Sequence, residues 1–314
     1  MTEQLTIVDA HQHFWDPGRN YHPWLADRPV AFRYGDYSAI IRRYLPDDYL
    51  RDARNYRVAG TVYIETEWDP RDPVSEMAYV KELRRVTGYP SVAVAQAWLD
   101  RGDAIPVLEQ LAAFDFVSGV RHKPRTNPTP QDSSPGGMMD AAWRKGFAAL
   151  NKFGLRYDLQ TPWWHLHEAA DVARAFPDMQ IILDHTGLPA DRSAEAVTAW
   201  ASAMALLAAC PNAAVKISGL GQPGQAWTAA SNREVVLTTI DLFGPERCMF
   251  ASNFPVDSLC GTFDDIFGGF DAITQDFAHD ERQRMFSGNA MRIYGIPAEA
   301  LRAPLQSRED GGEP

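Results

Sequence analysis

Short runs of apolar, often β-branched residues alternate along the chain with longer stretches in which apolar residues recur every three or four positions. The short runs are typical of buried strands, and the longer stretches, such as 73–85 and 232–244, are typical of amphipathic helices. Eight apolar runs can be distinguished, and they begin at Leu5, Val58, Ser91, Phe116, Gly154, Gln180, Ala213 and Cys248. Eight strand–helix pairs predict an α/β fold, a closed (β/α)8 TIM barrel. A doubly wound open sheet is the alternative, but no G-x-G-x-x-G follows an early strand.

Two segments lie outside this repeating pattern. Residues 14–45 follow the first strand, are rich in aromatic residues and are longer than an ordinary connection. We interpret them as a lid over the barrel mouth, and a hydrophobic plug on the barrel end is the alternative. Residues 302–314 are polar and carry glycine, which predicts a flexible tail. The chain is therefore predicted to form one barrel domain over 1–301.

Composition limits the partners. A net charge of −11 opposes a sequence-independent grip on phosphate backbones, so nucleic acid is not expected. No apolar stretch approaches the ~20 residues of a membrane span, and the N-terminus lacks the pattern of a signal peptide. Three cysteines, Cys210, Cys248 and Cys260, lack metal-type spacing and fit a reducing compartment. We expect a cytoplasmic protein that acts on a small molecule, with a homo-oligomer left open.

Polar residues follow seven of the eight predicted strands. Catalytic groups of such barrels lie at the C-terminal strand ends, so these positions point to one shared pocket. The candidates are His11 and His13, Glu65, Arg121 with His122, Tyr157, Asp184 with His185, Lys216, and Asn253 with Asp257 just beyond it.

The first of these ends, "VDAHQHFWDP" from Val8, carries two histidines. Alternation along a strand would place Asp9, His11 and His13 on one face. Buried polar groups without partners cost ~1–3 kcal/mol each. The pattern alone fits either a metal or catalytic site, or two histidines with satisfied hydrogen bonds in a core.

Five motifs carry a family resemblance: "DAHQHFW", "GVRH", "LDHTGLP", "KISGL" and "FASNFPVD". Together they resemble the amidohydrolase-related (amidohydrolase 2) TIM barrels, which include L-fuconolactonase-like sugar-acid lactonases and 2-pyrone-4,6-dicarboxylate lactonase. The likeness runs from about Ile7 to Ile296. It implies a hydrolase that opens a small lactone by activated water, with His11, His13 and His185 lining the site. A zinc-dependent non-oxidative decarboxylase or a cyclic amide hydrolase on the same barrel is the alternative, and a non-catalytic binding barrel is a third interpretation.

One position departs from the family. Its members usually carry an aspartate at the end of strand eight, where this chain has Asn253. An amide cannot take a proton at neutral pH, although it can hold water or donate to an oxyanion. The base is then His185, whose unperturbed pKa predicts activity rising near neutrality, or Asp257, which could equally be a turn residue.

The same departure bears on metal binding. His11, His13 and His185 would form a neutral ligand set for one divalent ion such as zinc, with weaker affinity than a set that includes a carboxylate. Because the lactonase branch is thought to include metal-free members, we expect no tightly bound metal. His11 and His13 would then polarise the carbonyl.

The remaining candidates are predicted to bind substrate. Arg121 is suited to grip a carboxylate, and a salt bridge to Glu65 is the alternative. This predicted set of substrate contacts is completed by Glu65, His122, Tyr157 and Lys216.

Overall fold

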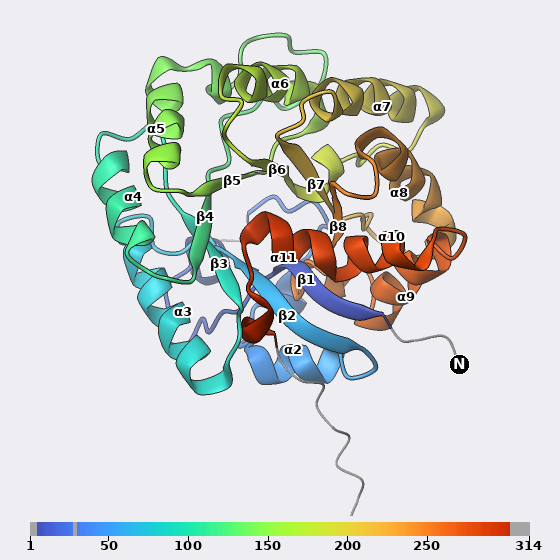
Figure 1. The fold of residues 1–314 in the computed structure, drawn as a ribbon, viewed down its shortest axis with the longest axis horizontal. Coiled ribbons are helices and arrows are strands. Elements are labelled where there is room, and N and C mark those ends of the chain that lie inside the picture. Colours follow the sequence, from blue (N-terminus) through green and yellow to red (C-terminus); the bar gives the residue numbers. More distant parts are fainter. Residues whose placement is uncertain (1–4, 28–29, 302–314) are drawn as a thin grey trace, which may run out of the picture.

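The computed structural model describes residues 5–27 and 30–301. Eight parallel strands follow one another in chain order around a barrel, with helices outside it (Figure 1), which confirms the predicted (β/α)8 fold. The strands are β1 (Thr6–Gln12), β2 (Arg57–Ile64), β3 (Val92–Gln96), β4 (Val117–Arg121), β5 (Arg156–Leu159), β6 (Ile181–Leu183), β7 (Ala213–Ile217) and β8 (Cys248–Phe250). Two backbone hydrogen bonds of 2.8 Å join the end of β8 to β1. The backbone N–H of Asn253 donates to the carbonyl of His11, and the backbone N–H of His13 donates to the carbonyl of Phe254.

The α-helices lie mainly between successive strands. They are α1 (Pro23–Ala26), α2 (Pro46–Asp52), α3 (Pro73–Thr87), α4 (Ala104–Ala112), α5 (Ala141–Lys152), α6 (Leu166–Ala175), α7 (Ala194–Ala208), α8 (Ala229–Phe243), α9 (Phe263–Ile273), α10 (His279–Gln283) and α11 (Asn289–Tyr294). Local sequence sets their ends. In α3, the Asp72 side chain accepts from the backbone N–H of Ser75, Pro73 opens the helix, and Gly88 ends it at φ 77°.

The core has two parts. Small aliphatic side chains such as Val8, Val62 and Val94 fill the barrel interior, where α11 adds Ile293 and Tyr294. Larger apolar side chains pack between the strands and the surrounding helices. The α11 helix therefore covers one barrel opening, toward the viewer in Figure 1, and leaves the C-terminal strand ends at the other opening.

Asp9 does not share a face with His11 and His13, so that expectation was wrong. Between Asp9 and Gln12, β1 has one residue more than β2, whose paired residues there are Thr61 and Tyr63. Such a bulge reverses the alternation of side chains. Asp9 consequently points outward, where it accepts a 2.8 Å hydrogen bond from the Tyr49 hydroxyl.

The described parts of the segment 14–45, which are residues 14–27 and 30–45, lie against the strand ends. Trp15 and Tyr44 exchange two backbone hydrogen bonds of 2.9 Å, and Trp24, Phe32 and Arg33 line the same cavity as His13 and His185. Its opening and closing as a lid stays a prediction. The predicted tail, 302–314, falls outside the described residues.

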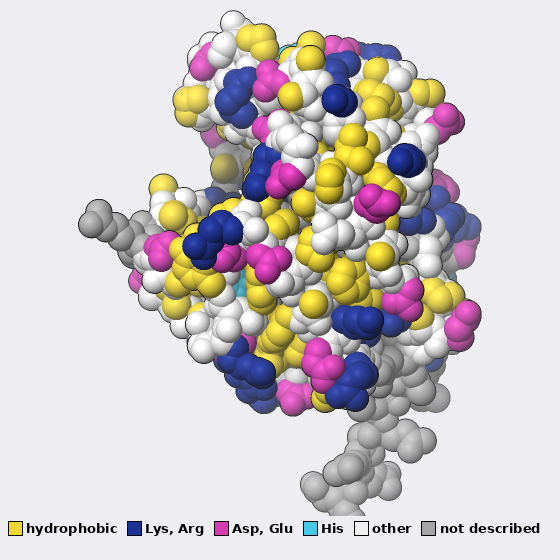
Figure 2. All heavy atoms as spheres, turned by 90° about the vertical axis from the view of Figure 1, so that its left-hand side faces the viewer, with side chains coloured by type: hydrophobic (Ala, Val, Ile, Leu, Met, Phe, Trp, Pro, Cys, Tyr) yellow, Lys and Arg dark blue, Asp and Glu magenta, His cyan; other side chains and the backbone are white. Residues whose placement is uncertain are grey.

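Other expectations concern the surface and the thiols. Acidic and basic side chains are interspersed on the face shown in Figure 2. None of the described helices is both long and apolar enough to cross a bilayer. Cys210, Cys248 and Cys260 are buried, unpaired thiols.

Candidate active site

A cavity of about 360 Å³ lies at the C-terminal ends of the strands. Its strand-end side chains include His13, Glu65, Arg121, Gln160, His185 and Asn253. The segment 14–45 contributes Arg33, which the sequence analysis missed because a lone arginine in an irregular segment carries no periodic signal. The predicted strand ends therefore supply one shared pocket.

His13 and His185 line this cavity, and His11 lies against both of them. The Nε2 atoms of His11 and His13 are 3.2 Å apart, and the ring centroids of His11 and His185 are 4.5 Å apart. Burial, with nearby positive charge, lowers the pKa of His13 to about 3 and holds those of His11 and His185 well below 6.5. All three imidazoles are therefore neutral at neutral pH, which suits them as proton acceptors or metal ligands.

The tautomer of His13 follows from its neighbour. Its Nδ1 lies 2.8 Å from the carbonyl oxygen of Ile64, and a carbonyl can only accept, so Nδ1 carries the proton. The Nε2 atom of neutral His13 is then an acceptor. His13 consequently cannot polarise a substrate carbonyl by donating a hydrogen bond from Nε2, contrary to its predicted role.

Lys216 lies below the cavity in a charged cluster that is completely buried. Its Nζ is 2.5 Å from Oδ1 of Asp158, 3.0 Å from Oδ1 of Asp184 and 3.4 Å from Nδ1 of His11. Tyr294 donates a 2.6 Å hydrogen bond to Asp158. Lys216 is thus not a substrate contact, because both carboxylates hold it beneath the histidines. The ligand atoms of His11, Asp184 and His185 lie close enough together to hold a metal ion. The ammonium group of Lys216, however, already occupies the space beside Asp184.

Arg121 forms the salt bridge that was the alternative to substrate binding. Its Nε donates to Glu65 at 2.5 Å, one terminal nitrogen donates to the Glu65 carbonyl at 2.8 Å, and the other donates to Gln160 at 3.1 Å. Only 4% of its side chain is exposed. Arg121 therefore shapes the cavity floor with its hydrogen bonds directed at protein groups.

Asn253 and Asp257 form a hydrogen-bonded pair. The Asn253 Nδ2 donates to Oδ1 of Asp257 at 2.6 Å, and the same oxygen accepts from the Tyr34 hydroxyl at 2.9 Å. Arg33 lies 3.7 Å from that oxygen. Burial raises the pKa of Asp257. Asn253 lines the cavity and Asp257 does not, so Asp257 holds Asn253 from behind.

Backbone strain collects at the same strand ends. Glu67, His185 and Asn253 have φ of 52°, 56° and 54°, which side-chain-bearing residues rarely adopt. Such conformations cost on the order of 1–3 kcal/mol each and cluster at functional sites.

Tyr157 is not in the cavity, so its predicted role as a substrate contact was wrong. It packs outward against Trp143 and Phe147 of α5, with ring centroids at 5.6 and 5.1 Å, and its hydroxyl donates to the carbonyl of His122 at 2.6 Å. Alternation along β5 places its neighbour Asp158 inward instead. His122 lines an adjoining cavity rather than the one that holds the histidines.

Comparison with known proteins assigns the chain to a family. A family model described as amidohydrolase (Amidohydro_2) matches residues 8–296. The chain belongs to the amidohydrolase family. This amidohydrolase is 36% identical over 306 residues to the uncharacterized protein y4mH of Sinorhizobium fredii, with 93% of this chain and 99% of the relative covered.

Two further comparisons bear on chemistry and fold. The amidohydrolase is 28% identical over 305 residues to an L-fucono-1,5-lactonase of Burkholderia ambifaria, which covers 92% of this chain and 95% of the relative. A zinc-bound amidohydrolase from Burkholderia multivorans superposes with a TM-score of 0.74 at 24% identity, covering 93% of this chain and all of that one. Family membership supports a hydrolase.

Proposed function

We propose that this amidohydrolase hydrolyses a small lactone of a sugar acid, by attack of water on the ester carbonyl. The meeting of His13, His185 and Asn253 in one strand-end cavity, with His11 packed against both histidines, carries the proposal. Similarity to an L-fucono-1,5-lactonase favours a lactone as the substrate. The nucleophile is water. Ring opening turns the ester carbonyl into a carboxylic acid and the former ring oxygen into a hydroxyl group.

His185 is the proposed base. Its Nδ1 lies 2.9 Å from the Ser218 hydroxyl, which orients the ring. Among the described residues its Nε2 has no hydrogen-bond partner, and the side chain lines the cavity. A neutral imidazole with one oriented nitrogen and one open nitrogen can accept the proton of an attacking water.

Arg33 is the proposed stabiliser of the oxyanion. Its side chain is 30% exposed and lines the cavity, and Asp257 lies 3.7 Å away. A fixed cation stabilises the negative charge that develops on the carbonyl oxygen. Arg33 thus takes the place of His13, whose neutral tautomer has no N–H available to donate to the substrate carbonyl.

The histidines also fit a divalent cation. Nε2 of His13 is an acceptor that faces Nε2 of His11 at 3.2 Å, so either His11 donates across this gap or a cation is shared by both nitrogens. Two neutral imidazoles, from His11 and His13, suit zinc, and His185, the third ligand expected from the sequence, is kept as the base. Zinc held there would polarise the substrate carbonyl as a Lewis acid. Asn253 is neutral and Asp184 is paired with Lys216, so we expect modest affinity.

We therefore expect the protein purified without added metal to contain less than one zinc per chain and to take up one on titration. His13→Ala should weaken zinc binding by a factor of at least ten, measured by titration calorimetry and elemental analysis. His167→Ala, which removes a histidine that is 61% exposed, is the matched control. Stoichiometric zinc that resists chelation, or unchanged binding in His13→Ala, would contradict this account.

Asn253→Asp should make stability fall as pH rises. The new carboxylate would lie where Nδ2 now donates at 2.6 Å, so it would share one proton with Asp257. A raised folded pKa means that the folded state holds a proton that the unfolded state releases. For each unit by which the folded pKa exceeds the unfolded pKa, the free energy of unfolding falls by ~1.4 kcal/mol as the pH rises from below the unfolded pKa to above the folded one.

Denaturant unfolding from pH 5 to 8 checks this expectation. The exchange variant Asn253→Asp with Asp257→Asn restores one carboxylate and one amide, and it should recover most of the lost stability. A single variant whose stability relative to the wild type does not change with pH would show that the two groups are not in contact.

A pH-indicator assay tests the proposed function. Single-ring 1,5- and 1,4-aldonolactones and cyclic dicarboxylate lactones are the substrates, and CO2 release from hydroxybenzoates tests the decarboxylase alternative. Release of acid from an aldonolactone supports the proposal, and CO2 release without lactone opening would refute it.

A further inference from the structure

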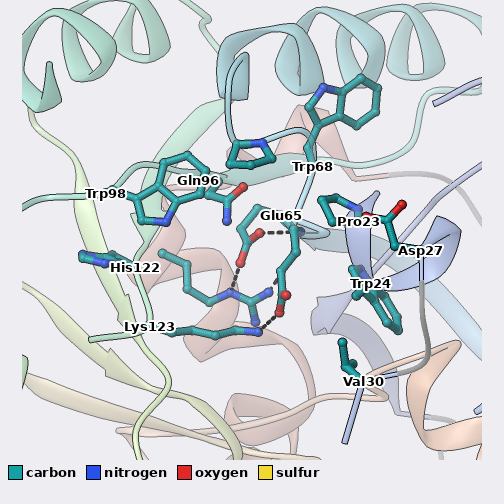
Figure 3. A pocket seen from close by; sticks show the side chains of 13 residues that line it. Pro23, Trp24, Asp27, Val30, Glu65, Trp68, Gln96, Trp98, His122 and Lys123 are labelled. Carbon is teal, nitrogen blue, oxygen red and sulfur yellow. Dashed lines mark hydrogen bonds and ion pairs between the residues drawn. The ribbon is translucent and has the colours of Figure 1, made fainter. Parts of the chain in front are cut away.

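A second cavity of about 580 Å³ adjoins the candidate active site. The two cavities lie side by side, because six residues line both of them: Trp24, Val30, Glu65, Glu67, Arg121 and Lys123. Glu67 and Lys123 form an ion pair and belong to these shared residues, and Lys123 is labelled in Figure 3. We call this second space the side cavity, and its own residues include Pro23, Trp68, Pro70, Gln96, Trp98 and His122. The proposed hydrolysis uses none of these six.

Aromatic rings held by their neighbours form part of the side-cavity wall. Trp68 packs edge-on against His22 with centroids 5.2 Å apart, and the Arg101 guanidinium lies 5.0 Å from the centroid of Trp98. Both indoles are only partly buried, which leaves apolar surface toward the cavity. Figure 3 shows both tryptophans among the side chains that line this cavity, together with Gln96.

Neutral hydrogen-bonding groups lie beside these rings. The Gln96 amide oxygen is buried and has no hydrogen-bond partner among the described residues. His122 accepts a 3.1 Å hydrogen bond at Nδ1 from the backbone N–H of Leu99, so its Nε2 carries the proton and is a donor. Four of the nearby charges, by contrast, are paired with one another, Glu65 with Arg121 and Glu67 with Lys123, and the carboxylate of Asp27 accepts a 2.7 Å hydrogen bond from the Tyr21 hydroxyl.

We propose that the side cavity binds a glycosyl ring attached to the lactone, so that the substrates are lactones of glycosylated sugar acids. This inference rests on the proposed lactone hydrolysis in the adjoining cavity. A pyranose ring offers C–H faces to indole rings and hydroxyls to Gln96 and His122. A purely aromatic substituent would leave those polar groups desolvated without partners, and a charged substituent would have to compete with ion pairs that are already formed.

Binding of the opened acids tests the side cavity without requiring turnover. Cellobionate and melibionate carry a hexose on different hydroxyls of gluconate, and at least one should bind tenfold or more tightly than gluconate by titration calorimetry. Trp98→Ala and the size-conserving Gln96→Met should each reduce that ratio by at least threefold. Trp164→Ala, which removes an indole that lines a different cavity, is the control and should leave the ratio unchanged.

The outcomes separate the two proposals. Equal affinity for gluconate and both glycosylated acids would overturn the side-cavity assignment even if single-ring lactones are hydrolysed. Absence of lactone hydrolysis would refute the proposed function, while the affinity ratio would still decide the side cavity. An aromatic ether, 6-O-benzylgluconate, that binds as tightly as melibionate and is unaffected by Gln96→Met would exclude the glycosyl ring as its ligand.

Discussion

The Lys216→Met variant should have a free energy of unfolding about 3–5 kcal/mol below that of the wild type. Methionine preserves much of the side-chain volume but leaves Asp158 and Asp184 buried without their shared ammonium, at 2.5 and 3.0 Å from the lysine nitrogen. Urea denaturation followed by circular dichroism measures the change.

Two further variants make this expectation specific. Arg85→Met breaks an ion pair with Glu82 whose side chains are 70% and 61% exposed, and it should cost less than about 1 kcal/mol. Adding Asp158→Asn to Lys216→Met removes one uncompensated charge and should recover part of the loss. A Lys216→Met variant as stable as Arg85→Met would show that the buried cluster contributes little to the fold.

His185→Ala should lower kcat for lactone hydrolysis by ~10²–10⁴-fold, because the proposed base is lost. Thermal unfolding of the same variant checks that the loss is not a folding defect. His167→Ala is the matched control, because that histidine is 61% exposed. Retention of more than a tenth of wild-type kcat in His185→Ala would reject it as the base and leave Asp257 as the group to test.

The pH profile of the wild type gives a second readout for the same residue. Burial and the neighbouring His11 and Arg33 hold the pKa of His185 well below 6.5. The base works only in its neutral form, so activity should fall on the acid side with a midpoint below 6.5, rather than near neutrality as its unperturbed pKa suggested. The sequence could not reveal this shift, because it depends on which charges the fold places around the ring.

The repeating pattern was enough to predict the barrel and the end of each strand at which polar residues gather. His11, His13, His185 and Asn253 could be predicted as neighbours because parallel strands in a barrel present their carboxyl ends to one mouth. Barrel topology alone brings these residues together, even though they are as much as 242 positions apart in the sequence.

The failures were of a different kind. Tyr157 and Asp9 were placed on the wrong face of their strands. For Tyr157, the prediction assigned every polar residue at the end of β5 to the pocket, although neighbouring side chains point to opposite faces. For Asp9, a bulge in β1 reverses the alternation. Lys216 was predicted to lie in the pocket, whereas it lies below the pocket and forms ion pairs there with Asp158 and Asp184. Arg33 was missed because irregular segments give no pattern from which side-chain direction can be inferred.

The central claim is that this amidohydrolase opens a sugar-acid lactone with water at its strand-end cavity. The most direct test is the initial rate of acid release from L-fucono-1,5-lactone and related single-ring aldonolactones, with zinc supplied, for the wild type and for His185→Ala. The account predicts release well above the rate in buffer for at least one lactone with the wild type, and near the buffer rate with the variant. Folded, zinc-supplied wild-type protein that releases acid no faster than buffer from every lactone tested would contradict it.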